Sequence, residues 1–208
     1  MENKKKKSIC IGITGGFASG KTTVAKIIEE YGFPVIYTDD LAKELMEKNE
    51  KIKKRIKVRF GDDVFNQDGS INNKKLAKIV FANTKEGQKK LQALNVIIHP
   101  AVIDEMSKLV DKYEAANEPL IFVESALIFE LGLDEGFDYV IAVYADDAVM
   151  IERAKLRGFN KEQVKQRLSQ QLPAQKKLEW GDFTINNNGS LVELREATIS
   201  LLNILKAM

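Results

Sequence analysis

The sequence of 208 residues predicts an α/β protein built around a parallel sheet, and three observations carry this prediction. Ser8 to Ile13 form a short run rich in β-branched residues, which is typical of a buried strand. An amphipathic helix pattern follows a glycine-rich turn, and a second strand is predicted from Phe33 to Thr38. A strand, a helix and a strand within about 30 residues make a βαβ unit, whose two strands run parallel.

The glycine-rich turn between these strands matches a phosphate-binding loop. Gly15 to Thr22 fit the pattern G-x-x-x-x-G-K-[ST], and the strand before it and the helix after it are the context that the motif requires. The glycines allow backbone angles that turn N–H groups toward phosphate oxygens. Lys21 would supply positive charge to β- and γ-phosphates, and the Thr22 hydroxyl is a suitable Mg²⁺ ligand.

Three later segments complete the predicted sheet. Each is short and apolar, and the middle one is almost continuously apolar, as expected of a strand covered on both faces. They are Leu120–Glu124, Tyr139–Tyr144 and Phe183–Asn186. A C-terminal amphipathic helix is predicted after Ser190, which suits an N-cap position.

Two intervals between the predicted strands are long. Leu41 to Glu118 exceeds a usual crossover connection and carries several helical patterns, one of them starting at Pro100. We interpret this interval as a helical subdomain inserted into the core; the alternative is helices that only extend the core. Residues 150–177 are rich in lysine and arginine, and Arg153 and Arg157 share one helix face. This segment is interpreted as a lid over phosphates, with a plain basic surface as the alternative.

Carboxylates at strand ends are the candidates for proton transfer. Asp39 stands at the carboxyl end of the second strand, the edge of a parallel sheet where ligands collect. It is placed to accept a hydroxyl proton or to hold a Mg²⁺-bound water. The neighbouring Asp40 leaves the assignment open, and a helix N-cap is the structural alternative. Glu124 either serves the metal through water or is structural.

Composition excludes several classes of protein. A net charge of +2 gives no argument for a nucleic-acid or membrane surface, and no stretch approaches the roughly 20 apolar residues of a membrane span. The single cysteine, Cys10, permits no internal disulfide and fits a reducing compartment. The single histidine, His99, is interpreted as structural. We therefore expect a cytoplasmic protein without nucleic-acid or membrane partners, and we interpret the lysines at 4–7 as a solvated terminus.

Several stretches, taken in order, resemble the dephospho-CoA kinase family over nearly the whole chain. The loop at 14–22 resembles T-G-G-I-G-S-G-K-S, and residues 35–39 resemble V-I-D-A-D. The other matches are Phe81–Asn83 with F-x-N, 94–100 with L-N-x-x-x-H-P, 127–130 with L-L-F-E, Arg153, Arg157, Arg167 and Gln171 with R-x-x-x-R and R-I-x-x-Q, and 182–190 with A-D-F-V-I-D-N-x-G-S. The loop is generic, whereas the other stretches are specific.

The resemblance implies a P-loop, three-layer α/β/α fold with a five-stranded parallel sheet, a helical substrate-binding insertion and a helical lid. The implied nucleotide-binding core comprises residues 1–40, 119–145 and 181–208. Residues 41–118 would form the helical domain that binds the CoA substrate, and residues 146–180 would form the lid.

The resemblance also implies an activity, which is transfer of the ATP γ-phosphate to the ribose 3′-hydroxyl of dephospho-CoA by a monomer. Asp39, Lys21, Arg153 and Arg157 take the catalytic positions, and Mg²⁺ would sit on Thr22. The implied nucleotide-binding residues are Gly15, Gly16, Phe17, Ala18, Ser19, Gly20, Lys21, Thr22 and Thr23 in the loop, with Asn187 and Gly189 near the adenine.

Three residues depart from the family pattern. Ala18 replaces a loop glycine, and we expect an alanine there only if its φ is negative. Tyr37 replaces an acidic residue, which leaves Asp39 without that partner, and Ala126 stands where the family usually has proline. Two other functions stay open: another small-molecule kinase with the same core, and a nucleotide-dependent binding or regulatory module.

Overall fold

The computed structural model describes residues 8–82 and 84–208. Asn83 of the F-x-N match and the lysines at 4–7 therefore lie outside the described residues. The chain divides into two compact units, Met1–Tyr37 with Val110–Met208, and Thr38–Leu109. Along the described chain, no helix has both the length and the apolar character needed to cross a membrane.

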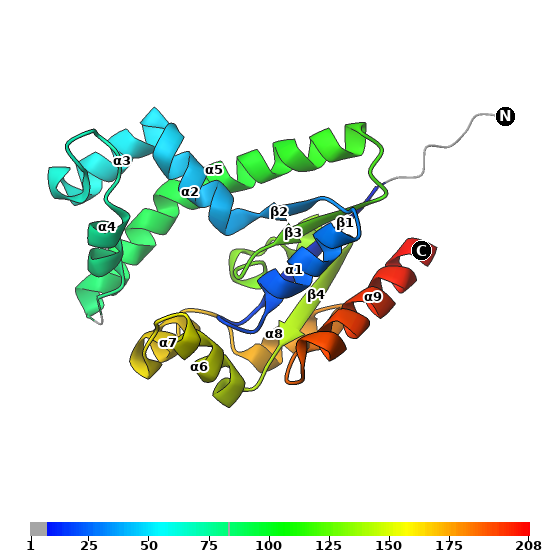
Figure 1. The fold of residues 1–208 in the computed structure, drawn as a ribbon. Helices are drawn as coiled ribbons and strands as arrows, with labels where there is room; N and C mark the ends of the chain where they lie inside the picture. The colour runs from blue at the N-terminus through cyan, green and yellow to red at the C-terminus, as the bar shows by residue number, and fades with distance from the viewer. Residues whose placement is uncertain (1–7, 83) are drawn as a thin grey trace. The chain divides into compact units, whose positions relative to one another are not determined.

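The first unit is built on a parallel sheet, as the sequence predicts. Within the described residues five strands pair in the order β2-β3-β1-β4-β5, and Figure 1 labels β1 to β4. They are β1 (Ile9–Gly15), β2 (Val35–Tyr37), β3 (Leu120–Glu124), β4 (Tyr139–Tyr144) and β5 (Phe183–Asn186). Every pairing is parallel, so the carboxyl ends of all five strands lie at one edge.

The alternation of side chains along β1 explains why the sheet is covered on both faces. Ile11 and Ile13 join a cluster with α1 (Lys21–Glu30) and α9 (Leu191–Ala207). The opposite face carries Gly12, whose missing side chain leaves room for Ile128 and Phe137. On that face α8 (Ala174–Trp180) contacts β4 and β1. The result is three layers, in agreement with the predicted fold class.

The segment predicted as a lid belongs to this first unit. It contains α6 (Asp147–Leu156), α7 (Lys161–Leu168) and α8. An asparagine capping box starts α7, in which Asn160 and Gln163 bond each other's backbone N–H groups. Two short 3₁₀ turns, Phe129–Leu131 and Asp134–Gly136, lie between β3 and β4. Whether the segment acts as a lid stays a prediction.

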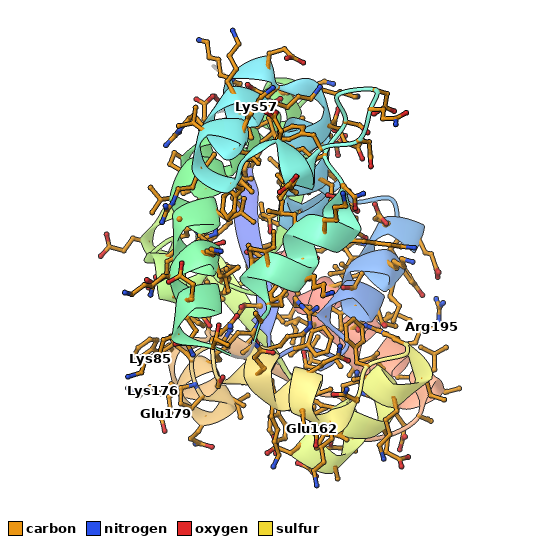
Figure 2. The ribbon with its side chains drawn as sticks, turned by 90° about the vertical axis from the view of Figure 1, so that its left-hand side faces the viewer. Lys57, Lys85, Glu162, Lys176, Glu179 and Arg195 are labelled. Carbon is orange, nitrogen blue, oxygen red and sulfur yellow. The ribbon has the colours of Figure 1, made fainter. Side chains whose placement is uncertain are left out.

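The second unit is helical and has its own core. Its helices are α2 (Thr38–Lys48), α3 (Glu50–Phe60), α4 (Asn73–Val80) and most of α5 (Lys85–Ala115), with a 3₁₀ turn at Asp62–Val64. Asn49 and Asn72 cap α3 and α4 through their side-chain oxygens. Lys57, labelled in Figure 2, pairs with Asp62 just after α3. That this unit binds the substrate stays a prediction.

The predicted helix start at Pro100 is wrong, because α5 runs through this residue without a break. An internal proline removes one backbone hydrogen bond and costs about 3 kcal/mol. The buried residues Leu94, Ile97, Ile98 and Val102 keep one face of the helix in the core of the unit on both sides of Pro100. Burial of several aliphatic side chains, at roughly 1.5–3 kcal/mol each, outweighs that cost.

Candidate active site

The predicted phosphate loop connects β1 to α1 and needs glycine at two positions for steric reasons. A Cβ on Gly15 would lie 2.3 Å from the Val143 carbonyl oxygen of β4. Gly20, the N-cap of α1, has φ 99°, and a Cβ there would lie 2.0 Å from the Asn187 side-chain nitrogen. The loop therefore turns tightly against β4 and against the residue that follows β5.

Ala18 contradicts the expectation of a negative φ, because its φ is 63°. A left-handed backbone costs an L-residue with a Cβ about 1–2 kcal/mol. The side chain is only 5 % exposed and packs among Ala145, Met150, Ala154 and Val164. These packing partners lie far from the loop in the sequence, so the sequence could not show this environment.

Lys21 and Glu124 form an ion pair at the carboxyl edge of the sheet. The Lys21 Nζ lies 3.5 Å from the Glu124 Oε1, and the two side chains are 12 % and 5 % exposed. Glu124 reaches this place because β3 pairs with β1, where it stands opposite Ile13. Glu124 thus lies beside the loop lysine, and its role at a metal stays a prediction.

Asn187 ties the loop to the basic helix α6. Its side-chain Nδ2 donates to the Ser19 carbonyl oxygen at 2.8 Å, and its Oδ1 accepts from Arg153 Nη2 at 3.3 Å. The residue is 4 % exposed, and its backbone N–H donates to the Tyr144 carbonyl oxygen. The Arg153 Nη1 is buried without a hydrogen-bond partner among the described residues.

A pocket of about 310 Å³ opens beside this chain of contacts. It lies against the loop, and leucine side chains provide apolar walls. The lining residues include Gly20, Thr23, Arg153, Arg157, Asn187 and Leu191. A pocket with apolar walls, two arginines and the N-terminal turn of a helix suits an anionic ligand that carries a flat apolar group.

The structure brings most of the predicted site residues together, but not all. Residues 15–23, Arg153, Arg157 and Asn187 lie in the first unit, around the loop and its pocket. Gly189 lies beside the capping box of α9, where a Cβ would meet Glu193. Asp39 is an exposed residue in the first turn of α2, which belongs to the second unit.

Two neighbours of Asp39, Tyr37 and Asp40, have polar partners of their own. The Tyr37 hydroxyl donates to Glu29 at 2.7 Å, so this residue contacts α1. Asp40 pairs with Lys43 one turn along α2, at 2.6 Å. The Asp40 carboxylate thus pairs at the surface of its own helix, and the choice between the two neighbours stays a prediction.

Sequence reasoning missed a buried ion pair. The Lys177 Nζ lies 2.8 Å from Glu130 Oε1 and donates to the Ala126 carbonyl oxygen at 2.6 Å, and its side chain is 2 % exposed. Burial lowers the pKa of Lys177, while the bond to Glu130 opposes this shift. The L-L-F-E match pointed to Glu130 but not to its partner, which lies 47 residues away in the sequence.

This combination of fold and site defines a nucleotide-binding protein of the P-loop class. A sequence model of the dephospho-CoA kinase family matches residues 9–193. A dephospho-CoA kinase of Geobacillus kaustophilus is 35 % identical over 196 residues, covering 94 % of this chain and 96 % of the relative. The chain therefore belongs to the dephospho-CoA kinase family.

Two solved structures agree with this assignment. The protein TT1252 from Thermus thermophilus is 31 % identical, with a TM-score of 0.78 over 96 % of this chain and 99 % of that one. A dephospho-CoA kinase from Campylobacter jejuni is 27 % identical, with a TM-score of 0.69 over 95 % of this chain and 98 % of that one.

Proposed function

We propose that this protein transfers the γ-phosphate of ATP to the ribose 3′-hydroxyl of dephospho-CoA, yielding coenzyme A and ADP in the last step of CoA biosynthesis. The observation that supports the proposal most directly is the phosphate loop, whose Lys21 is held at the sheet edge by Glu124. The chain around this loop matches the dephospho-CoA kinase family over residues 9–193. In this proposal the protein acts as a monomer in the cytoplasm, with dephospho-CoA as its small-molecule partner.

The loop and α1 hold the phosphates of ATP. Backbone N–H groups at the start of α1 and the positive end of its dipole favour an anion there. Lys21 is held near this position by Glu124, and its flexible stem lets the ammonium group follow the β- and γ-phosphates. Glu124 thus pairs with the buried lysine before the nucleotide arrives.

The pocket beside Gly20 receives the base and ribose of ATP. Arg153 and Arg157 line it and supply positive charge on the side of the phosphates. Both polar atoms of the Asn187 side chain already bond to protein groups, so Asn187 contributes by holding the loop and Arg153 in place. The apolar walls of the pocket, Leu156, Leu191 and Leu194, would then pack against the base.

A Mg²⁺ ion fits the same site. Thr22 presents a hard oxygen in the first turn of α1, next to Lys21. Magnesium keeps most of its waters and binds through one or two protein oxygens together with substrate phosphates, so a single hydroxyl suffices. When bound, the ion would neutralise charge on the β- and γ-phosphate oxygens.

Asp39 accepts the proton of the 3′-hydroxyl. It follows β2 by two residues, and the carboxyl end of β2 lies at the same sheet edge as that of β1. The engagement of Asp40 with Lys43 supports the choice of Asp39. A base aligned on the acceptor hydroxyl contributes about 10²–10⁴-fold in rate.

A coupled assay of ADP release tests the proposal. With ATP and dephospho-CoA, we expect acceptor-dependent turnover that Asp39→Asn lowers by about 10²–10⁴-fold while ATP still binds. Asp40→Asn separates the two neighbouring aspartates. Glu30→Gln, at an exposed ion-pair residue of α1 outside the predicted substrate domain, is the control.

Three outcomes would contradict parts of the proposal. Near-normal turnover of the Asp39→Asn variant removes Asp39 from the role of base. ADP release with nucleosides but not with dephospho-CoA indicates a different small-molecule kinase. ATP binding without any acceptor-dependent turnover indicates a binding or regulatory module.

A further inference from the structure

Phe17, in the phosphate loop, is held by groups from the segment around α7. Its backbone N–H donates to Gln171 Oε1 at 3.1 Å. The Arg167 guanidinium lies over its ring at 5.1 Å and over the ring of Phe159 at 4.8 Å. The two rings meet edge to face, with centroids 5.1 Å apart. We call Phe17, Phe159, Arg167 and Gln171 the Phe17 latch.

The residues on either side of Phe17 are covered by the same segment. Ala18 packs among buried residues of α6 and α7, among them Met150 and Val164. A Cβ on Gly16 would lie 3.3 Å from the Met150 sulfur and 3.5 Å from Leu168. Residues 16–18 are thus pressed between the end of β1 and these two helices.

The latch lies next to the strained residue of the loop. Ala18, next to Phe17, has φ 63°. For an alanine this conformation is disfavoured by a factor on the order of tenfold or more. Such a residue stays in place only where its surroundings hold it there. Here an N–H bond, a stacked guanidinium and the ring of Phe159 fix Phe17, the residue before it.

We propose that the Phe17 latch sets the conformation of the phosphate loop before ATP binds, and that Arg167 and Gln171 are positioning residues for that loop. Without the latch, Ala18 relaxes out of the left-handed region, and ATP must then restore it on binding. The proposal rests on the proposed function only in assigning ATP phosphates to this loop. It does not depend on the identity of the acceptor.

A competing reading makes Arg167 a source of positive charge for the phosphates. The two readings differ in how they depend on residue 18. Loss of a charge weakens ATP binding by the same factor whichever residue stands at position 18. Loss of the latch matters only while position 18 is strained, because glycine adopts a positive φ readily.

The experiment measures the Kd of Mg-ATP by isothermal titration calorimetry, without an acceptor. Arg167→Gln and Gln171→Met are each made in the natural chain and in an Ala18→Gly chain. We expect each change to raise Kd about tenfold in the natural chain and about twofold or less with glycine at 18. Arg195→Gln is the control, because Arg195, labelled in Figure 2, is a partly exposed residue of α9 that pairs with Glu30 at the end of α1.

Equal factors in the two backgrounds, or an unchanged Kd, would overturn the proposal. Circular dichroism establishes whether each variant is folded. If Arg167→Gln does not fold, the comparison is made with Gln171→Met alone. A natural chain that binds ATP yet leaves dephospho-CoA unmodified contradicts the proposed function and leaves this measurement valid.

Discussion

Asn187 illustrates, at the scale of a single residue, how one side chain can join two parts of a site. The sequence places it near the nucleotide through the motif at 182–190. The structure shows that its amide bonds Ser19 on one side and Arg153 on the other. A side-chain amide offers two N–H donors and one acceptor oxygen, and here one donor and the oxygen are engaged within the protein. Its contribution is therefore to join the loop to α6.

At the same scale, His99 is predicted to make the stability of the fold depend on pH. Burial lowers the pKa of this half-buried imidazole below its ordinary value of 6.5. Between the lowered pKa and 6.5 the unfolded chain binds more protons than the folded one, so stability rises with pH and is lost as pH falls. The contribution of His99 to the free energy of unfolding is complete above pH 6.5, and it changes by at most about 1.4 kcal/mol per pH unit.

Urea unfolding at pH 5.0 and 7.5 measures this effect. We expect the difference in unfolding free energy between the two pH values to be smaller in His99→Gln than in the natural chain. Because His99 is the only histidine, carboxylates supply the remaining pH dependence and are the same in both proteins. An identical pH difference in the two proteins would rule out this contribution from His99.

At the scale of elements, α8 is fastened to the loop after β3 by the Lys177–Glu130 pair. Glu130 Oε1 also accepts from the Leu172 backbone N–H at 2.8 Å, so one carboxylate binds the start and the middle of the same segment. This arrangement fixes the chain between α7 and β5 against the second face of the sheet.

Removing Lys177 should therefore destabilise the protein strongly. Lys177→Met leaves Glu130 buried without its cation, which costs about 3–5 kcal/mol in unfolding free energy. Adding Glu130→Gln should recover a large part of that loss, because the uncharged amide still accepts from Leu172. Denaturant unfolding of the two single variants and the double variant measures both effects. Additive losses in the double variant would contradict a pairwise interaction.

At the scale of the whole molecule, each of the two units has its own hydrophobic cluster. One lies between the sheet and helices α1 and α9, and the other lies among α2 to α5. A unit with a separate core can respond to a ligand on its own. The assignment of ATP to one unit and dephospho-CoA to the other becomes testable for this reason.

Hydrogen exchange of backbone amides tests this assignment. We expect ATP alone to slow exchange between Gly15 and Val24 in the first unit. Dephospho-CoA alone should slow exchange within Thr38–Leu109. Protection by dephospho-CoA confined to the first unit would contradict the prediction that residues 41–118 form the substrate domain.

Much of this molecule could be predicted from the sequence because its signals are local. The five strands are short apolar runs, and the loop is a motif of eight consecutive residues. The predicted helix start at Pro100 was wrong. The tendency of proline to interrupt a helix was outweighed by the packing of buried side chains on both sides of it. The expectation of a negative φ at Ala18 was wrong for a related reason, since helices distant in the sequence pack against the loop.

By itself, the sequence determined the class of fold, the phosphate loop and the family, since these depend on the order and spacing of nearby residues. Only the tertiary structure decided that Glu124 pairs with Lys21, that Glu130 pairs with Lys177, and that Arg167 and Gln171 hold Phe17. These partners lie far apart along the chain. Burial brings them into contact, and a buried charge or N–H group must find a partner in whichever segment the fold places beside it.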